Sequence, residues 1–193
     1  MAAESVSEDV PLASRTVLNL GCGRRHRADA VNLDVTGRTN PDVVHDLNVR
    51  PWPFPSDRFT AVIAHDVIEH LDDLIGTMEE VHRVCREGAT VDLVVPHFSS
   101  SNAFTDPTHR RFFSRFTFDY LSEGHDLDFY TPARFDVVAA NLVFQPTLLN
   151  KVVWRLANRF PRAYERRWAW IFPAWFVYVK LRVVKQPPSG FSR

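Results

Sequence analysis

The part of the sequence that most restricts the fold is a short apolar run that leads into a glycine turn. Residues 17–20 precede Gly21 and Gly23, and a second apolar run carries Asp34 at its end. Glycine at both positions permits positive φ angles and a close approach of backbone to a ligand. An acid at the carboxyl end of the second strand can accept hydrogen bonds from both hydroxyls of a ribose. The pattern therefore predicts a site for an adenosine-containing cofactor.

Seven short apolar segments predict the strands of one sheet. The early segments are continuous apolar runs, as in parallel strands that are covered on both faces. The last segment alternates, with Val177, Val179 and Leu181 on one side and Tyr178 and Lys180 on the other. The expected strands are 16–20, 30–35, 42–45, 59–64, 90–95, 135–144 and 175–184.

One helix is expected between the fourth and fifth strands. Asp72 or Asp73 can cap its start, and Gly88 is expected to stop it. Its apolar positions at helical spacing are Leu74, Met78, Val81 and Cys85. Only about ten residues separate the first two strands, whereas a crossover helix normally takes a dozen or more. The first helix should therefore be reduced to about a turn, which leaves that half of the sheet thinly covered.

The pattern changes after Pro146. Residues 147–160 and 162–172 predict two helices that Pro161 separates and Pro173 closes. One apolar face should carry Tyr164, Trp168, Ile171 and Phe172. At 193 residues and 45% hydrophobic content, the chain suits a single domain. We place that domain at 15–185, with a helical insertion at 146–174, a flexible arm at 1–14 and a flexible tail at 186–193.

With these segments placed, the chain resembles the class I S-adenosylmethionine-dependent methyltransferases, in particular the small bacterial type-11-like group. The resemblance covers about residues 15–145, and it rests on LNLGCG at 18–23, NLDV at 32–35, HDLN at 45–48, WPFPSDRFTAVIAHDVIEHL at 52–71 and RVCREGATVDLVVPH at 83–97. It implies a Rossmann-like α/β fold with a mostly parallel seven-stranded sheet, an antiparallel last strand and a helical insertion before that strand. It also implies S-adenosylmethionine as cofactor and S-adenosylhomocysteine as product.

The resemblance also implies a cofactor site. The glycine turn would lie against the methionine part, Asp34 would bind the ribose, and Asp46 and Leu47 would border the adenine. His65 and Asp66 would lie near the sulfonium, at the carboxyl end of the fourth strand. The expected cofactor-binding residues are Asn19, Gly21, Cys22, Gly23, Asp34, Asp46, Leu47, His65 and Asp66. The turn is followed by Arg24, Arg25, His26 and Arg27 where relatives often have a third glycine, which leaves open whether an arginine reaches the cofactor carboxylate.

Methyl transfer requires an aligned acceptor and, where needed, a base that removes a proton. The candidates for catalysis follow the fifth strand: His97, and His109 with Asp106 to orient its ring. The segment from Asp106 to His109 can equally begin a helix, with Asp106 as cap and Pro107 at the first position. We leave both interpretations open.

No metal site is expected. His65, Asp66, His97 and His109 come from separate loops without the spacing of metal ligands. Glu69 and His70, in the Ile-Glu-His-Leu segment, are assigned structural roles.

Charge and cysteine usage exclude several classes of protein. The formal net charge is zero, so a nucleic-acid partner is not expected. Cys22 and Cys85 cannot form a disulfide framework, and the polar amino terminus has no signal-peptide core, so we expect a cytoplasmic protein. The aromatic and basic segment 154–182 has three interpretations: a lid, a homo- or hetero-oligomer interface, or an interfacial membrane element. We favour the first two, and we expect no membrane association.

The function that these observations favour is methyl transfer to a small-molecule acceptor, in the biosynthesis of a secondary metabolite. Two alternatives stay open. The first is an enzyme of the same fold that binds the cofactor and catalyses a cyclisation or elimination without methyl transfer. The second is a subunit that binds a partner through its aromatic carboxyl-terminal region.

Overall fold

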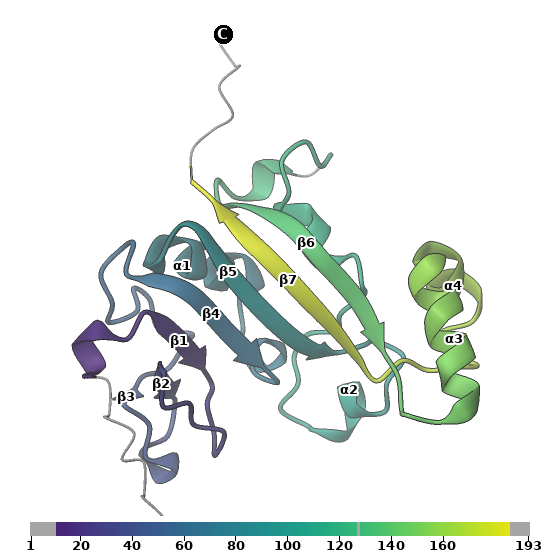
Figure 1. The fold of residues 1–193 in the computed structure, drawn as a ribbon, viewed down its shortest axis with the longest axis horizontal. Coiled ribbons are helices and arrows are strands. Elements are labelled where there is room, and N and C mark those ends of the chain that lie inside the picture. Colours follow the sequence, from purple (N-terminus) through teal and green to yellow (C-terminus); the bar gives the residue numbers. More distant parts are fainter. Residues whose placement is uncertain (1–10, 127, 186–193) are drawn as a thin grey trace, which may run out of the picture.

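The computed structural model describes residues 11–126 and 128–185, which build one seven-stranded sheet in the order β3-β2-β1-β4-β5-β7-β6 (Figure 1). β1 pairs in parallel with β2 and β4, β2 with β3, and β4 with β5, whereas β7 is antiparallel to both β5 and β6. The strands are β1 (Val17–Leu20), β2 (Ala30–Asp34), β3 (Val43–Val44), β4 (Phe59–His65), β5 (Cys85–Pro96), β6 (Arg134–Val143) and β7 (Phe176–Val184). The predicted mostly parallel sheet with an antiparallel last strand is confirmed.

Only α1, α3 and α4 among the described helices are longer than five residues; the others are short turns. The helices are α1 (Leu74–Val84), α2 (Asn102–Thr105), α3 (Leu148–Arg159) and α4 (Pro161–Arg167), with 3-10 turns η1 (Leu12–Ser14), η2 (Gly37–Thr39), η3 (Ile68–His70), η4 (Thr117–Leu121) and η5 (Asp128–Tyr130). No helix in the described ranges is long and apolar enough to cross a membrane. The first ten residues of the predicted arm and the whole predicted tail lie outside the described residues.

Helix α1 begins where the sequence predicts and ends earlier. The carboxylate of Asp73 accepts a hydrogen bond from the backbone N–H of Gly76 at 3.0 Å, which caps the helix. The helix stops at Val84, and Cys85 is already the first residue of β5, so the predicted end at Gly88 is wrong. The carbonyl groups of Arg83 and Val84 accept backbone hydrogen bonds from Asp57 and Arg58. The two residues that precede β4 therefore satisfy these carbonyls in place of a glycine cap.

The link between β1 and β2 contains no helix, not even the single turn that its length predicts; its described residues form turns. Two buried amides organise it. The side-chain amide of Asn19 donates to Asn32 Oδ1 at 3.0 Å and to the carbonyl of Arg25 at 3.0 Å. Asn32 Oδ1 also accepts from the N–H of Arg27 at 2.9 Å. These bonds satisfy backbone groups that a helix would otherwise pair.

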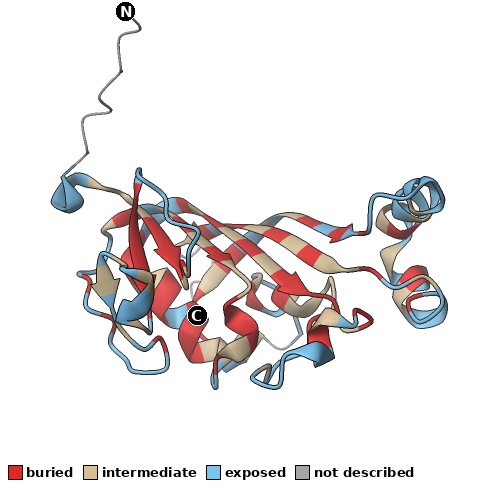
Figure 2. Cartoon of the chain, turned by 90° about the horizontal axis from the view of Figure 1, so that it is seen from below, coloured by how far each residue is buried: buried red, intermediate tan, exposed pale blue. Residues whose placement is uncertain are grey.

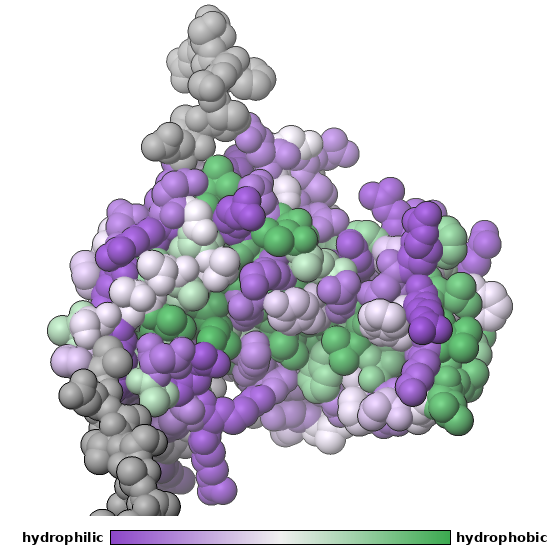
Figure 3. Space-filling view, viewed as in Figure 1, coloured by the Kyte–Doolittle hydropathy of each residue, from purple (hydrophilic) through white to green (hydrophobic). Residues whose placement is uncertain are grey.

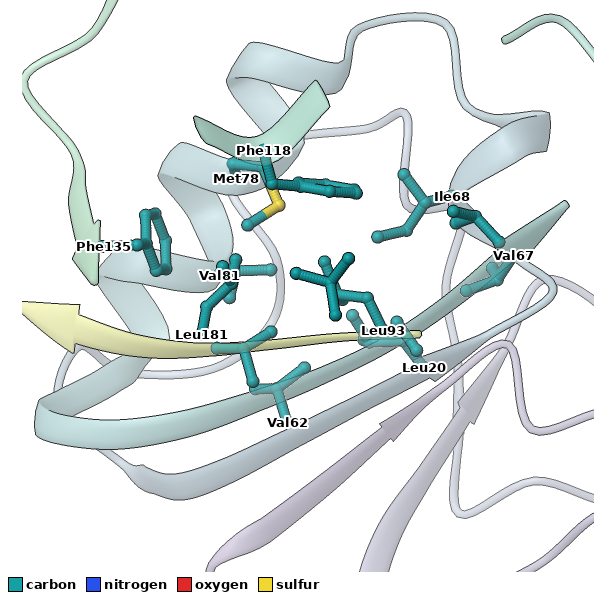
Figure 4. Close-up of a cluster of buried hydrophobic side chains, with 14 of the residues drawn as sticks. Leu20, Val62, Val67, Ile68, Met78, Val81, Leu93, Phe118, Phe135 and Leu181 are labelled. Carbon is teal, nitrogen blue, oxygen red and sulfur yellow. The ribbon is translucent and has the colours of Figure 1, made fainter. Parts of the chain in front are cut away.

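The core lies on one face of the sheet. Figure 2 shows the sheet nearly edge-on, with short helices gathered on one side. Figure 4 shows side chains of the strands meeting those of α1 and of η4; they include Leu20, Val62, Leu93, Leu181, Met78, Val81 and Phe118. In β5 and β7 the alternate side chains are only half-buried. Coverage on both faces, which the apolar runs predict, therefore does not hold for this part of the sheet.

The predicted insertion lies between β6 and β7, where α3 and α4 sit beyond the ends of these strands (Figure 1). The second helix ends at Arg167, five residues before the predicted end at 172. The Tyr164 hydroxyl donates to the carbonyl of Phe172 at 2.7 Å and accepts from the N–H of Ala174 at 2.9 Å, which folds the chain back toward β7. Trp168 and Ile171, expected on a common apolar face with Tyr164, are largely exposed.

Candidate active site

The glycine turn after β1 has the backbone that the sequence predicts. Gly21 and Gly23 have φ angles of 57° and 50°, which disfavour residues with a Cβ atom. A Cβ atom on Gly21 would lie 2.5 Å from Cγ2 of Val67, so only glycine fits at this close approach. The turn therefore packs directly against the segment that follows β4.

Asp34 holds the turn from the end of β2. Its Oδ2 accepts a hydrogen bond from the N–H of Gly23 at 2.8 Å, and its Oδ1 accepts from the N–H of Thr36 at 3.1 Å. Each carboxylate oxygen has a further lone pair. Asp34 can thus fix two loops and still accept hydrogen bonds from a ligand beside it.

A cavity of about 340 Å³ opens at the carboxyl ends of β1, β2 and β4. We call it the cofactor cavity. Its lining includes five of the nine predicted cofactor-binding residues, namely Gly21, Asp34, Asp46, Leu47 and Asp66. Asp46 accepts from the N–H of Asn48 at 2.9 Å, and Trp52 donates its indole N–H to the carbonyl of Leu47 at 3.1 Å. Three carboxylates and an apolar wall therefore meet around one space.

Three of the other predicted residues lie elsewhere. Asn19, Cys22 and His65 line a second cavity of about 270 Å³, which shares only Gly21 with the cofactor cavity, and Gly23 lines neither. Burial raises the pKa of the Cys22 thiol and lowers the pKa of His65. Both side chains are therefore favoured in their neutral forms.

Arg25, one of the basic residues after the turn, faces the end of β4. Its guanidinium lies 2.8 Å from Oδ2 of Asp66, whose φ angle of 55° places it in the left-handed region. The Arg25 side chain is 67% exposed, so the pair contributes little to stability and can open.

A larger cavity of about 630 Å³ adjoins the cofactor cavity, because Asp66 and His70 line both. We call it the acceptor cavity. Its other lining residues come from η3, the end of β5, α2, the turn 106–109 and the start of β7. Predicted residues Asp106 and His109 both belong to this lining.

The relation between Asp106 and His109 differs from both sequence interpretations. Asp106 Oδ1 accepts from the N–H and the hydroxyl of Thr108, at 2.8 and 2.7 Å, and so closes a turn in which no helix begins. Hydrogen bonds from Thr108 keep the pKa of Asp106 low. The ring of His109 is instead oriented by the carbonyl of Ala103, which lies 3.2 Å from its Nδ1.

Two further residues of the acceptor cavity are Glu69 and His70, for which the sequence predicts structural roles. Glu69 is 1% exposed, and neither of its carboxylate oxygens has a hydrogen-bond partner in the described part of the chain. Burial raises the pKa of Glu69 to about 7. The nearest ring nitrogen of His109 lies 4.0 Å from Glu69 Oε1, and the rings of His70 and His109 are 4.7 Å apart. The one available signal in the sequence was the adjacent pair Glu69-His70 at the end of a strand.

His97 has no exposed surface and is not among the residues that line these cavities. Its Nδ1 lies 2.7 Å from the Ser99 hydroxyl, and its Nε2 lies 3.3 Å from Oε1 of Glu165 in α4. Glu165 also accepts from the Ser114 hydroxyl at 2.6 Å and from the N–H of Arg115 at 2.7 Å. Burial raises the pKa of Glu165, but hydrogen bonds from His97, Ser114 and Arg115 outweigh it and hold that pKa below its usual value. The sequence predicts His97 as a functional residue, but it does not predict that Glu165 of the insertion is its partner.

Comparisons with known proteins agree with this arrangement. Residues 24–92 match the family model of the type 11 methyltransferase domain. No curated protein matches the chain in sequence.

Three solved structures have a similar fold. An S-adenosylmethionine-dependent methyltransferase from Archaeoglobus fulgidus matches with a TM-score of 0.61 at 17% identity, over 89% of this chain and 87% of that chain. A putative methyltransferase from Haloferax volcanii, solved in complex with the activator Trm112, matches with 0.54 at 16% identity, over 89% and 83%. The [4+2]-cyclase SpnF matches with 0.56 at 15% identity, over 91% and 79%.

The matched segment begins within the loop after the glycine turn and ends in β5, so it spans Asp34, Asp46 and the Asp66–His70 segment. The strand order of the sheet is that of the class I methyltransferases. Residues 24–92 thus match a methyltransferase domain, and the described chain has the Rossmann-like fold of the class I S-adenosylmethionine-dependent methyltransferases.

Proposed function

We propose that this enzyme transfers a methyl group from S-adenosylmethionine, bound in the cofactor cavity, to a small molecule bound in the acceptor cavity. The observation that carries the proposal is the junction of the two cavities at Asp66 and His70. A transferred group must pass from donor to acceptor in line, so two sites that share a wall are the geometry that such a reaction requires.

The residues of the cofactor cavity suit this cofactor. Asp34 and Asp46 offer carboxylate oxygens to ribose hydroxyls and to an exocyclic amine, and Leu47 and Leu71 offer apolar surface to an adenine ring. Asp66 offers a negative charge to an ammonium group where the two cavities meet. When bound, the cofactor supplies an electrophilic methyl group on a positively charged sulfur.

The chain's own contribution is to bind, to align and to take up a proton. His109 lines the acceptor cavity with Nδ1 held by a carbonyl, which leaves Nε2 to accept a proton from an acceptor. His97 is buried against Glu165, and we infer that it positions the insertion beside the end of β5. We propose that the acceptor is a small molecule of secondary metabolism.

Methyl-labelled S-adenosylmethionine tests the proposal. The purified chain is incubated with panels of small hydroxylated and carboxylated molecules, and label in the organic product is counted together with S-adenosylhomocysteine. Label in an acceptor that grows with S-adenosylhomocysteine in a one-to-one ratio is the expected result. If the cofactor binds tightly but no label moves to any acceptor, methyl transfer is not the reaction of this protein.

A second reaction is compatible with the same cavities, since a [4+2]-cyclase shares the fold. In that case the acceptor cavity would enclose a substrate that cyclises or eliminates without gaining a methyl group. The two reactions differ in one product, because only methyl transfer makes S-adenosylhomocysteine in proportion to turnover.

We also propose that the exposed face of α3 and α4 is an interface to another protein, a second copy of this chain or a different subunit. Figure 3 shows apolar side chains gathered over these helices, beside a groove of about 440 Å³. The exposed apolar side chains of this region include Leu148 in α3, which is 83% exposed, and Trp170 just after α4, which is 70% exposed. Patches of this kind mark interaction sites in stable proteins. The Haloferax volcanii protein of the same fold binds its activator Trm112, so partner binding has a precedent in this fold.

A further inference from the structure

We propose that Glu69, His70 and His109 together bind a divalent metal ion of the zinc or manganese type inside the acceptor cavity. One ligand atom from each residue lies within 4.8 Å of the other two. The residues come from η3 and from the turn 106–109, which the hydrogen bonds from the N–H groups of Arg110 and Arg111 to the carbonyl of Glu69 hold together.

The Glu69 carboxylate is buried without a hydrogen-bond partner among the described residues. Glu69 is 1% exposed, and both of its carboxylate oxygens lack such a partner. Buried carboxylates are normally paired or hydrogen-bonded, because an isolated one is costly to remove from water. A cation between this carboxylate and the two imidazoles would supply the missing partner.

The hydrogen bonds of Thr108 set the tautomer of His70. The Thr108 hydroxyl donates its proton to Asp106 Oδ1 at 2.7 Å, so it can only accept from Nδ1 of His70, which lies 2.8 Å away. Nδ1 therefore carries the proton, and Nε2 of His70 has a free lone pair. The chain from Asp106 through Thr108 to His70 is the kind of outer hydrogen bonding that orients metal-binding imidazoles.

The tautomer of His109 is fixed in the same way, by the partner of its Nδ1. The carbonyl of Ala103 can only accept, so Nδ1 of His109, 3.2 Å from it, carries the proton. Its Nε2 then turns a lone pair toward Glu69 Oε1, 4.0 Å away. Each of the three residues thus offers a ligand atom to one space, and these atoms lie within 4.8 Å of one another.

Protein cations nearby have other partners. Arg25 pairs with Asp66, Arg110 pairs with Asp72, and Arg111 donates to the carbonyl groups of Leu71 and Asp72. The converging acceptors therefore are not neutralised by these arginines. Two histidines and one carboxylate suit zinc, iron and manganese, with about 2.0–2.2 Å from each ligand atom to the ion. The three ligand atoms lie within 4.8 Å of one another, so binding an ion would require their side chains to rotate toward it, and all three residues line the acceptor cavity.

The site has a consequence for the acceptor, which rests on the proposed function. With the ion bound, Nε2 of His109 would be a ligand and would no longer take up the proton. An acceptor with a hydroxyl or carboxylate oxygen would complete the coordination of the ion, which would align it and ease loss of its proton to water. This selects oxygen-bearing acceptors over purely apolar ones.

Titration of the chelator-treated full chain with Mn²⁺, followed by electron paramagnetic resonance and calorimetry without cofactor, tests the site. The wild type should bind one equivalent, and Glu69→Gln and His109→Ala should each weaken binding at least tenfold. Thr108→Val, which removes the outer bond to His70, should weaken it by roughly tenfold to a hundredfold. His125→Asn, outside the cavity lining, should leave it unchanged.

Glu69→Gln is expected to fold, since it replaces a buried carboxylate that has no hydrogen-bond partner among the described residues by a neutral group of the same shape. Its thermal unfolding without metal should be at or above that of the wild type. Wild-type protein without saturable Mn²⁺ or Zn²⁺ binding overturns the proposal. Equal binding by wild type and Glu69→Gln overturns it as well. Because cofactor is absent from the titration, a failure of methyl transfer would leave these outcomes unaffected.

Discussion

At the scale of single residues, the glycine turn and its acid are the best-determined part of the site. The spacing of Gly21, Gly23 and Asp34 predicts positive φ angles at the two glycines and the meeting of the turn with Asp34 at one edge of the sheet, and both follow from local chain geometry. The group formed by Glu69, His70 and His109 could not be predicted in this way. Its members are distant in sequence, and their significance lies in burial and in the direction of lone pairs, which only the folded chain fixes.

Gly21→Ala should destabilise the protein more than Gly124→Ala does. Both glycines have a positive φ, so each substitution should cost about 1 to 2 kcal/mol of unfolding free energy from backbone strain alone. A Cβ atom at Gly124 meets nothing within 4 Å, whereas one at Gly21 lies 2.5 Å from Val67. Urea unfolding of the two variants measures the difference, and equal losses would contradict the close packing of the turn on Val67.

At the scale of elements, strands and helix starts are predicted well and helix ends less well. The seven strands follow from apolar runs, and α1 follows from its cap and spacing. Its end at Val84 depends on hydrogen bonds from residues 57 and 58, which are remote in sequence. The link after β1 depends on the buried Asn19–Asn32 pair for the same reason. In both places tertiary contacts override the local signal.

The contact of α4 with the end of β5 should depend on pH. The folded pKa of Glu165 is below its usual value of 4.5, so the carboxylate stabilises the fold above about pH 4.5 and that contribution is lost as the pH falls through the folded pKa. Glu165→Gln should therefore be less stable than wild type at pH 7, and the two should converge at lower pH. Urea unfolding at several pH values measures this.

The exposed Glu123→Gln serves as control for the loss of one acid. If Glu165→Gln and Glu123→Gln lower the free energy of unfolding at pH 7 by the same amount, the hydrogen bonds of Glu165 do not stabilise the contact of the insertion with the end of β5.

At the scale of the whole molecule, the chain is a sheet covered mainly on one face, with an aromatic helical pair beyond one end (Figure 2). The position of the insertion in sequence was predicted, because prolines bound it. The exposure of its apolar side chains was not, since an amphipathic pattern only says that one face is apolar and does not say whether this chain covers it.

Leu148→Ser combined with Leu149→Ser should weaken association without unfolding the chain. The two side chains are 83% and 61% exposed, so the fold loses little, and changes at such positions usually stay within about 0.5 kcal/mol. Sedimentation velocity over a range of concentrations, alone and with candidate subunits, measures the effect. Phe129→Ser, at an equally exposed position in η5, should leave association as in the wild type. Association that survives the double substitution would place the interface elsewhere.

The central claim is that the cofactor cavity binds S-adenosylmethionine through Asp34, and calorimetric titration of the cofactor tests it most directly. The wild type should bind with one-to-one stoichiometry, and Asp34→Ala should weaken binding by about 1 to 3 kcal/mol, the loss expected for hydrogen bonds to a charged group. Asp136→Ala, an exposed acid on β6, should bind as the wild type does. Equal affinity of Asp34→Ala and wild type, or no binding by the wild type, would contradict the claim.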